Sequence, residues 1–237
     1  MRRLLTKGAD VRYEYKADPD WERHLHERLG RPWPCAETQE FDALWKQVAE
    51  SFDQQGLAMG RATYGGWDDG DRGFARAVWC LTRHLEATRV VETGVARGIT
   101  SRVILEALER GGDGRLCSID LPALDTAFHT QIGAAVPGEL RGRWTYVNGT
   151  SRSRLPGLLA ELGEIDLFVH DSSHTTRNLH FELERAWGAM RRGAVLADDI
   201  ERNEAFGKFM RARPDVPTFV AAADDGVAMF GIALKGF

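Results

Sequence analysis

The segment T-R-V-V-E-T-G-V-A-R-G-I-T-S, residues 88–101, decides the fold of this chain. A short run of β-branched residues ends at Glu92, and Gly94 and Gly98 follow four residues apart. A segment with helical apolar periodicity then opens at Thr100. This order predicts a strand, a glycine-rich turn and a helix N-terminus, the place where an open α/β sheet usually binds a nucleotide-like ligand.

Beyond this turn the chain alternates apolar runs with amphipathic segments. The runs that predict strands are 115–119, 144–147, 165–169 and 194–197. Helical periodicity follows the last three, and two further strands, 218–223 and 227–234, flank the hairpin signal Asp224-Asp225-Gly226. The pattern predicts a doubly wound α/β fold, with a largely parallel sheet and one antiparallel strand at its end.

The N-terminal part of the chain predicts helices that cannot form a core of their own. The helices expected before the glycine turn are 20–29, 41–52 and 74–85. A glycine-rich loop is expected at 60–70, where Tyr64 and Trp67 are incidental surface aromatics as readily as residues that close a pocket. We expect residues 1–70 to be an N-terminal helical cap or arm on a ligand-binding domain of residues 71–237.

The composition narrows the class of protein. A chain of 237 residues suffices for one well-buried domain, and a net charge of −4 gives no electrostatic case for nucleic acid. No apolar run approaches the roughly 20 residues that span a bilayer. The three cysteines, Cys35, Cys80 and Cys117, show neither metal-ligand spacing nor a disulfide framework, so we expect structural thiols and a cytoplasmic location.

Polar residues follow the predicted strands at the point where each strand ends. These residues are Glu92, Asp120, Asn148-Gly149, Asp171 and Asp198-Asp199. Because the carboxyl ends of parallel strands meet at the crevice that holds the ligand, we expect this row to form the site.

The first members of the row indicate the kind of ligand. An acid before the first glycine would repel a pyrophosphate, so Glu92 and the wide glycine spacing favour a ligand with an ammonium group and no phosphate. Thr100 and Ser101 lie where helix N–H groups can face a carboxylate. Asp120 can accept hydrogen bonds from both hydroxyls of a ribose. Together they indicate an adenosine with an amino-acid tail; a purely structural turn and a solvated acid are the alternatives.

From about Phe74 to Phe237 the chain resembles the class I S-adenosylmethionine-dependent methyltransferases. The resemblance rests on V-V-E-T-G-V-A-R-G-I-T-S, on L-C-S-I-D-L-P and on the final hairpin, and it implies a Rossmann-like seven-stranded sheet. The cofactor contacts that it implies are Glu92, Gly94, Ala96, Gly98, Thr100, Ser101, Asp120, Leu121, Gly149, Thr150, Ser151, Asp171 and Ser172.

The later strand ends predict a metal site. Three carboxylates at adjacent strand ends repel one another, and a hard cation such as Mg²⁺ would relieve the repulsion. The stretches F-V-H-D-S-S-H and A-D-D resemble those of the metal-dependent O-methyltransferases of the catechol and macrolide-sugar types. That resemblance implies Asp171, Asp198 and Asp199 as metal ligands and His174 as general base, with Asp171 and His174 the catalytic residues. Asp199 stands where the catechol type has Asn.

The leading hypothesis is therefore a Mg²⁺-dependent O-methyltransferase that acts on a small hydroxylated acceptor, a sugar or phenol of a specialised metabolite. The alternatives are a metal-independent N- or O-methyltransferase with His174 as base, a cephalosporin-hydroxylase-like protein, and a nucleoside-binding protein without catalysis. No nucleic-acid or membrane partner is expected. The N-terminal helices are a candidate surface for a homo-oligomer.

Overall fold

The computed structural model describes residues 13–237 of the chain. Its elements are, in chain order, α1 (Trp21–Leu29), α2 (Thr38–Gln54), β1 (Gly60–Tyr64), β2 (Trp67–Asp69), α3 (Arg72–His84), β3 (Arg89–Thr93), α4 (Ile99–Gly111), β4 (Arg115–Asp120), the 3₁₀ helices η1 (Thr126–Gln131) and η2 (Gly138–Arg143), β5 (Trp144–Asn148), α5 (Ser151–Leu162), β6 (Leu167–His170), α6 (Thr176–Gly188), β7 (Gly193–Ala197), η3 (Ile200–Arg202), α7 (Ala205–Arg211), β8 (Thr218–Ala222) and β9 (Met229–Lys235).

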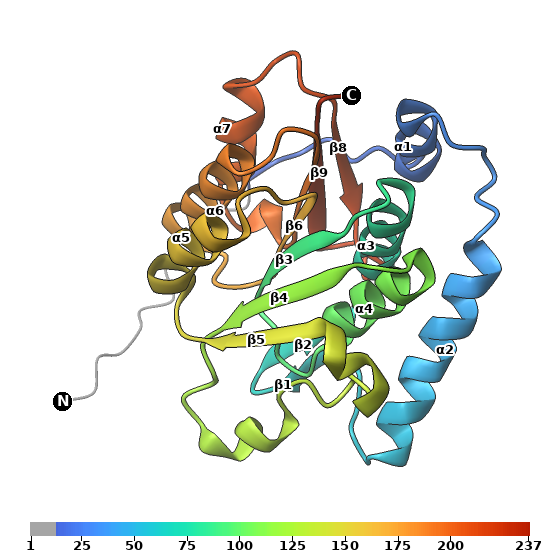
Figure 1. Cartoon of the computed structure of the whole chain (residues 1–237), viewed down its shortest axis with the longest axis vertical. Helices are drawn as coiled ribbons and strands as arrows, with labels where there is room; N and C mark the ends of the chain where they lie inside the picture. Colours follow the sequence, from blue (N-terminus) through green and yellow to red (C-terminus); the bar gives the residue numbers. More distant parts are fainter. Residues whose placement is uncertain (1–12) are drawn as a thin grey trace.

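A seven-stranded sheet with the order β5-β4-β3-β6-β7-β9-β8 forms the centre of the molecule (Figure 1). Strands β3 to β7 pair in parallel with their neighbours, and β9 runs antiparallel to both β7 and β8. The predicted Rossmann-like, mostly parallel sheet with a C-terminal antiparallel hairpin is confirmed. Strand β3, the strand of the glycine turn, lies between β4 and β6. The chain builds the sheet outward from β3 to β5 on one side and then continues with β6 on the other side, so the strand order reverses at β3.

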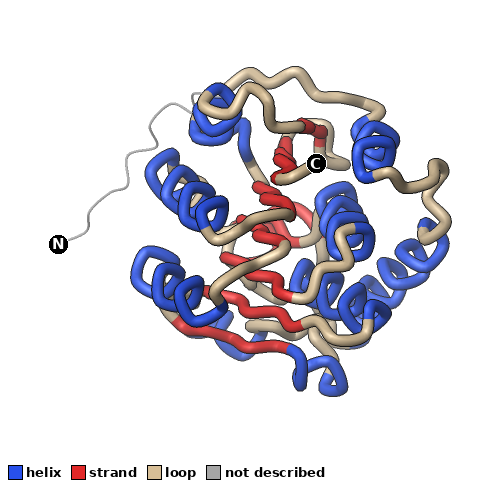
Figure 2. Tube along the Cα trace, turned by 45° about the horizontal axis from the view of Figure 1, so that its top comes forward, coloured by secondary structure: helices blue, strands red, loops and turns tan. Residues whose placement is uncertain are grey.

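Helices cover both faces of the sheet (Figure 2). Helices α3 and α4 lie on one face, and α5, α6 and α7 lie on the other. Successive residues of a strand point to opposite faces, so Val90 of β3 packs with α3 and α4 whereas Val91 packs with α5 and α6. Both faces being covered explains why the strands read as continuous apolar runs.

The N-terminal helices share the core of the sheet domain. Leu25 of α1, and Phe41, Leu44 and Phe52 of α2, belong to the same buried cluster as α3 and α4. Burying such side chains contributes roughly 1.5–3 kcal/mol each, which attaches helices that could not fold alone. In the part of the chain that the structure describes, no helix has the length and apolarity to cross a bilayer.

The segment 60–70 differs from the expected loop. Strands β1 and β2 form an antiparallel hairpin, with Tyr64 opposite Trp67. Gly65 and Gly66 make the two-residue turn, with φ of 59° and 89°. A glycine pair between two aromatic residues is a hairpin signal that we had interpreted as a loop, so that prediction was wrong.

Candidate active site

The polar strand ends meet in one cavity of about 1220 Å³ at the carboxyl edge of the parallel strands. The predicted residues that line it are Gly94, Ala96, Thr100, Asp120, Leu121, Gly149, Thr150, Ser151, Asp171, Ser172, His174, Asp198 and Asp199. Three other predicted residues, Glu92, Gly98 and Ser101, lie outside its lining. The hairpin β1–β2 supplies a further wall, which includes Tyr64 and Trp67.

The glycine turn brings the first strand end against the fourth. Gly94 has φ of 89°, and a Cβ at this position would lie 1.8 Å from the carbonyl oxygen of Asp171. The N–H of Asp171 in turn donates to the carbonyl oxygen of Thr93 at 2.8 Å. Only a residue without a side chain permits this approach, so the turn and the acid after β6 form one wall.

Glu92 lies behind the turn and is fully buried, with 0% exposure. Its Oε2 accepts hydrogen bonds from the hydroxyls of Ser101 and Ser118, each at 2.6 Å, and its Oε1 has no partner. Burial raises the pKa of Glu92 to about 7, although both serine hydrogen bonds oppose the shift. Because this carboxylate is fully buried, its position does not suit a direct contact with a ligand in the cavity. It suits a role in supporting the glycine turn from behind.

Asp120 and the loop after β5 form the other end of the cavity. Burial raises the pKa of Asp120, while backbone N–H groups at Ala96 and Leu121 partly offset the rise. Thr150 caps α5, because its side chain accepts from the N–H of Ser153. The cavity therefore meets an acid on one strand end and a helix N-terminus on the next.

The carboxylates after β6 and β7 carry negative charge that nearby cations only partly balance. Burial raises the pKa of Asp171 well above its usual value, and the charge of Asp199 adds to the rise. Burial and the charges of Asp171 and Asp199 act in the same way on the pKa of Asp198. Burial raises the pKa of Asp199 to about 6, although the guanidinium of Arg202, 2.8 Å from its Oδ2, opposes the rise.

His174 lies between two of these acids. Its Nε2 is 3.5 Å from Oδ2 of Asp199 and 4.0 Å from Oδ1 of Asp171. Burial, together with the charges of His170 and Arg202, lowers the pKa of His174 to about 3. The imidazole is therefore neutral near pH 7 and has a lone pair with which it can accept a proton.

The three acids offer the right donors for a hard cation, because carboxylate oxygens are the ligands that Mg²⁺ prefers. Burial and repulsion by neighbouring carboxylates raise the pKa values of Asp171 and Asp198, and a bound cation would offset both effects. Their ligand atoms do not converge, however. Within residues 13–237, the one group of His, Cys, Asp and Glu side chains with mutually close ligand atoms lies elsewhere, at His26, Cys35, Cys80 and His84. Asp171, Asp198 and Asp199 therefore fit a Mg²⁺ ion in the type of their donor atoms, but their ligand atoms are not gathered around one point.

A buried ion pair beneath β6 escaped prediction from the sequence. His170 Nδ1 lies 2.6 Å from Glu182 Oε2, and both side chains have 0% exposure. The carboxylate also accepts from Thr93 at 2.6 Å and from Ser172 at 3.0 Å. Burial raises the pKa of Glu182, but the charge and hydrogen bond of His170 outweigh burial and lower it to about 2. His170 is thus a buried structural residue, and its contact with Glu182 joins the two strand ends that border Gly94.

Arg97 was also missed, and it joins the hairpin to the glycine turn. Its guanidinium donates to the carbonyl oxygens of Ala58 and Thr63, each at 2.7 Å, and lies 3.4 Å from Asp69 Oδ2. Burial raises the pKa of Asp69 to about 6, against the attraction of Arg97. The signal in the sequence was an arginine between two turn glycines, whose partners are distant in the chain.

Comparison with known proteins agrees with this architecture. A family model described as a methyltransferase domain matches residues 91–200, a little under half of the chain. No curated protein matches the chain significantly. Among solved structures the chain is similar to a candidate O-methyltransferase from Klebsiella pneumoniae, with a TM-score of 0.60 and 18% identity over 92% of this chain and 98% of that one.

Two structures with bound cofactor are similar to the same extent. An O-methyltransferase from Bacillus cereus in complex with SAH has a TM-score of 0.60 and 14% identity, over 90% of this chain and 96% of that one. The O-methyltransferase TomG from Streptomyces achromogenes, in complex with SAM, has a TM-score of 0.60 and 17% identity, over 81% and 89%.

These similarities concern the fold, and the family match concerns a segment that begins within β3 and ends just after β7, so it carries the glycine turn and the ends of the parallel strands. Residues 91–200 are therefore similar to a methyltransferase domain, and they form the central part of a seven-stranded sheet that the similar solved structures share.

Proposed function

We propose that the protein transfers the methyl group of S-adenosylmethionine to a hydroxyl oxygen of a small polar acceptor. The observation that carries this proposal is the shared cavity of about 1220 Å³, which joins Gly94 and Asp120 to the acid and imidazole of Asp171 and His174. Ligand pockets commonly occupy roughly 300–1,000 Å³, so this cavity has room for a donor and an acceptor together.

The donor would lie along the first three strand ends. In this proposal Asp120 accepts from the ribose hydroxyls, and Leu121 and the loop Gly149–Ser151 border the adenine. The methionine part lies over Gly94 and Ala96, with its carboxylate toward the start of α4 at Thr100. Gly98, Ser101 and Glu92 support this turn from behind, and Ser172 closes the wall beside Asp171.

The acceptor would lie beside the acids, with its hydroxyl near His174. The neutral imidazole takes the hydroxyl proton as the new carbon–oxygen bond forms and the bond from the methyl carbon to sulfur breaks. S-adenosylhomocysteine then leaves, and the protonated His174 returns its proton to solvent. Much of the rate enhancement would come from holding oxygen and methyl in line.

A Mg²⁺ ion held by Asp171, Asp198 and Asp199 is part of the proposal. When bound, it supplies Lewis acidity that lowers the pKa of the acceptor hydroxyl. A base with a pKa near 3, such as His174, is weak for an ordinary alcohol and suits a hydroxyl that is already acidified. Burial and repulsion by neighbouring carboxylates raise the pKa values of Asp171 and Asp198, and the relief that a cation would bring supports its presence.

The class of acceptor follows from the walls of the acceptor side. Among the residues that line the cavity, Trp67 offers an aromatic face, whereas Arg61 and Arg202 offer hydrogen-bond donors. A sugar or phenol presents both an apolar face and hydroxyls, which suits such walls. TomG, whose fold is similar, acts in tomaymycin synthesis, and we place the acceptor here among specialised metabolites. The unpaired cysteines support a cytoplasmic location.

The decisive experiment measures release of S-adenosylhomocysteine from S-adenosylmethionine with a panel of sugars, phenols and amines, each with Mg²⁺ and with a chelator. We expect methylated oxygen, detected by mass spectrometry, with hydroxylated acceptors and Mg²⁺ only. Failure of S-adenosylmethionine to bind in a calorimetric titration would refute the proposal at its first step. A hydroxylated product would instead support the cephalosporin-hydroxylase-like alternative.

A second candidate keeps the donor and omits the metal. It is favoured by the position of His174 Nε2 between Asp171 and Asp199, which can orient an imidazole base without a cation. Full activity in the presence of a chelator would select this candidate, and methylation of an amine would extend it to nitrogen acceptors.

A further inference from the structure

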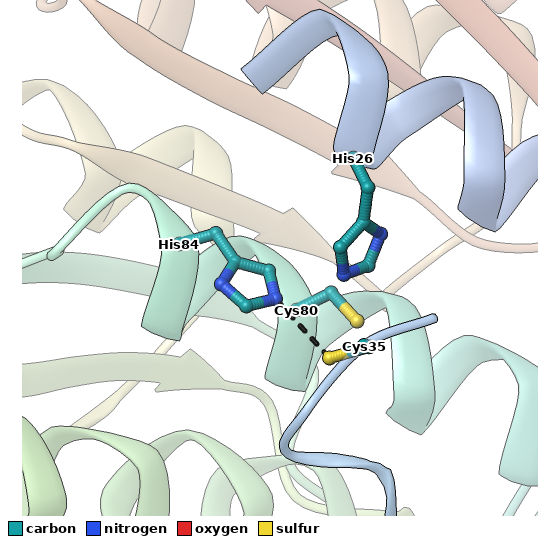
Figure 3. Close-up of side chains that lie close together, drawn as sticks. All are labelled: His26, Cys35, Cys80 and His84. Carbon is teal, nitrogen blue, oxygen red and sulfur yellow. Dashed lines mark hydrogen bonds between the residues drawn. The ribbon is translucent and has the colours of Figure 1, made fainter. Parts of the chain in front are cut away.

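Four side chains far from the catalytic cavity meet between α1 and α3 (Figure 3). His26 comes from α1, Cys35 from the segment between α1 and α2, and Cys80 and His84 from α3. Three of them are buried and His84 is half-buried. We call these four residues the Cys₂His₂ cluster. Its geometry differs from the expectation that Cys35 and Cys80 belong to no metal-ligand group.

The ligand atoms of the Cys₂His₂ cluster are close enough for one metal ion. One atom from each side chain lies within 4.8 Å of every other, and Cys35 Sγ is 3.5 Å from His84 Nε2. Tetrahedral zinc, with bonds of about 2.3 Å to sulfur and about 2.0–2.1 Å to nitrogen, separates its ligand atoms by about 3.3–3.8 Å. Small side-chain rotations bring the longer separations into this range.

His26 is oriented as a metal ligand. Its side chain has 0% exposure, and its Nδ1 lies 2.7 Å from the carbonyl oxygen of Glu22. A carbonyl oxygen only accepts, so Nδ1 carries the proton and Nε2 carries a lone pair. That Nε2 is buried without a hydrogen-bond partner. Metal-binding histidines usually donate their other N–H to a carbonyl or carboxylate in this way, and a metal ion would satisfy Nε2.

The chemistry and charge of the cluster select the metal. Two thiolates and two imidazoles in a closed tetrahedron are a zinc set, whereas Mg²⁺ requires oxygen donors. Zn²⁺ with two thiolates has no net charge and can be buried without a counter-ion. Next to it, Glu22 Oε1 lies 3.7 Å from Cys80 Sγ and also accepts from Arg76 Nη2 at 2.7 Å, so the neighbouring charges are already paired.

We propose that the Cys₂His₂ cluster binds one structural Zn²⁺ ion, with Cys35 and Cys80 each releasing its thiol proton to solvent as its zinc–sulfur bond forms. Four protein ligands leave no open position for a substrate, so the ion serves the fold. It fastens α1, a helix of nine residues that would be marginal alone, and the segment 30–37 to α3. Helix α3 begins at Arg72 in the wall of the cavity, so the zinc also fixes that wall.

Elemental analysis of the full-length protein, purified without chelator, tests this proposal. We expect about one zinc ion per chain. Replacing zinc with Co²⁺ should give the visible bands of a tetrahedral site and a near-ultraviolet sulfur-to-cobalt charge-transfer band. This measurement needs no variant, so it holds even where a ligand substitution prevents folding.

The variants Cys35→Ser and Cys80→Ser should lose the zinc and the charge-transfer band, and should lower the thermal midpoint. Cys117→Ser is the matched control, because Cys117 is also a buried free cysteine but lies in β4 outside the cluster, and it should keep one zinc. Asp198→Ala should keep it as well, which separates this site from the acids of the cavity.

Two results with the wild-type protein would overturn the proposal. One is reduced protein that neither contains zinc nor binds Zn²⁺ or Co²⁺ on titration. The other is a disulfide between Cys35 and Cys80 in protein prepared without oxygen, which would show that the sulfurs pair with each other. Zinc retained in both Cys35→Ser and Cys80→Ser would equally contradict the assignment.

Discussion

Two groups of potential metal ligands in this chain are built in opposite ways. Asp171, Asp198 and Asp199 are oxygen donors that follow β6 and β7, line the open cavity and do not converge. The Cys₂His₂ cluster has sulfur and nitrogen donors, is closed off by packed helices and does converge. A site for catalysis must leave room for the acceptor, whereas a structural site needs every position filled. The difference suggests an exchangeable ion at the acids and a permanent one at the cluster.

The largest effect is expected for a substitution among the acids of the cavity. Asp198→Ala should lower kcat by about 10²–10⁴-fold, because it removes a proposed metal ligand beside the proposed acceptor site. The dissociation constant for S-adenosylmethionine should change little, as Asp198 lies outside the proposed donor contacts. Calorimetry and steady-state kinetics measure both. Asp113→Ala, at an exposed acid before β4, is the control, and equal activity of the two variants would remove Asp198 from the mechanism.

Chelation should separate the two groups directly. Brief treatment with EDTA should lower activity by about 100-fold, and excess Mg²⁺ should restore it, because a cation at the cavity exchanges with solvent. The zinc content should stay unchanged over the same period, since three of the four cluster ligands are buried. Activity and zinc lost together, and restored by Zn²⁺ alone, would show that one metal serves both purposes.

The glycine turn comes next in expected magnitude. Gly94→Ala places a Cβ 1.8 Å from the carbonyl oxygen of Asp171 at φ of 89°, so it should destabilise the fold by about 3 kcal/mol or more and weaken donor binding. Gly66→Ala is the matched control, because Gly66 has the same φ of 89° with nothing within 4 Å of the added Cβ. The Gly66→Ala variant should lose only about 1–2 kcal/mol of unfolding free energy. Equal losses in urea denaturation would mean that conformation, and not close approach, requires glycine at position 94.

Much of the fold was predictable because its signals are local. The apolar runs and the turn at Gly94 gave the strands, and the acids after β4, β6 and β7 gave the row that lines the cavity. The Y-G-G-W hairpin was present in the sequence and was misread as a loop. The cysteine pair was different: Cys80 and His84 are four residues apart on a helix, but Cys35 and His26 reach them only through the packing of α1 on α3. The spacing of these residues along the sequence therefore does not reveal that they are in contact.

Burial was the other property that the sequence did not reveal. Glu92, expected to meet the ligand, and Glu182, which was not singled out, are both fully buried carboxylates with 0% exposure. Their pKa values nevertheless move in opposite directions, because Glu92 has only serine hydroxyls as partners whereas Glu182 has His170. Partners brought together by the fold decide this, so the charge state of an acid in a motif cannot be read from the motif.

The raised pKa of Glu92 predicts a pH dependence of stability. An acid whose pKa is about 7 when folded and near 4.5 when unfolded binds its proton more tightly in the fold. Its stabilising contribution is complete below pH 4.5 and is lost as the pH rises toward 7. Glu92→Gln cannot titrate and so removes this pH dependence. Between pH 5 and pH 8 the unfolding free energy of the wild type should therefore fall by about 2 kcal/mol relative to that of the variant. A difference independent of pH would mean that Glu92 is ionised in the fold.

The smallest expected effect tests the hairpin as the wall of the acceptor side. Trp67 is 61% exposed, so Trp67→Ala should change the free energy of unfolding by less than about 0.5 kcal/mol. Trp67 also lines the cavity from β2, and its loss should raise KM for an aromatic or sugar acceptor by roughly 5–10-fold, the value of one aromatic contact. The dissociation constant for S-adenosylmethionine serves as the internal control and should not change, because the proposed donor site lies over the strand ends and not against Trp67. If donor affinity fell while KM for the acceptor held, the hairpin would close over the cofactor, and specificity would have to come from the acids and arginines alone.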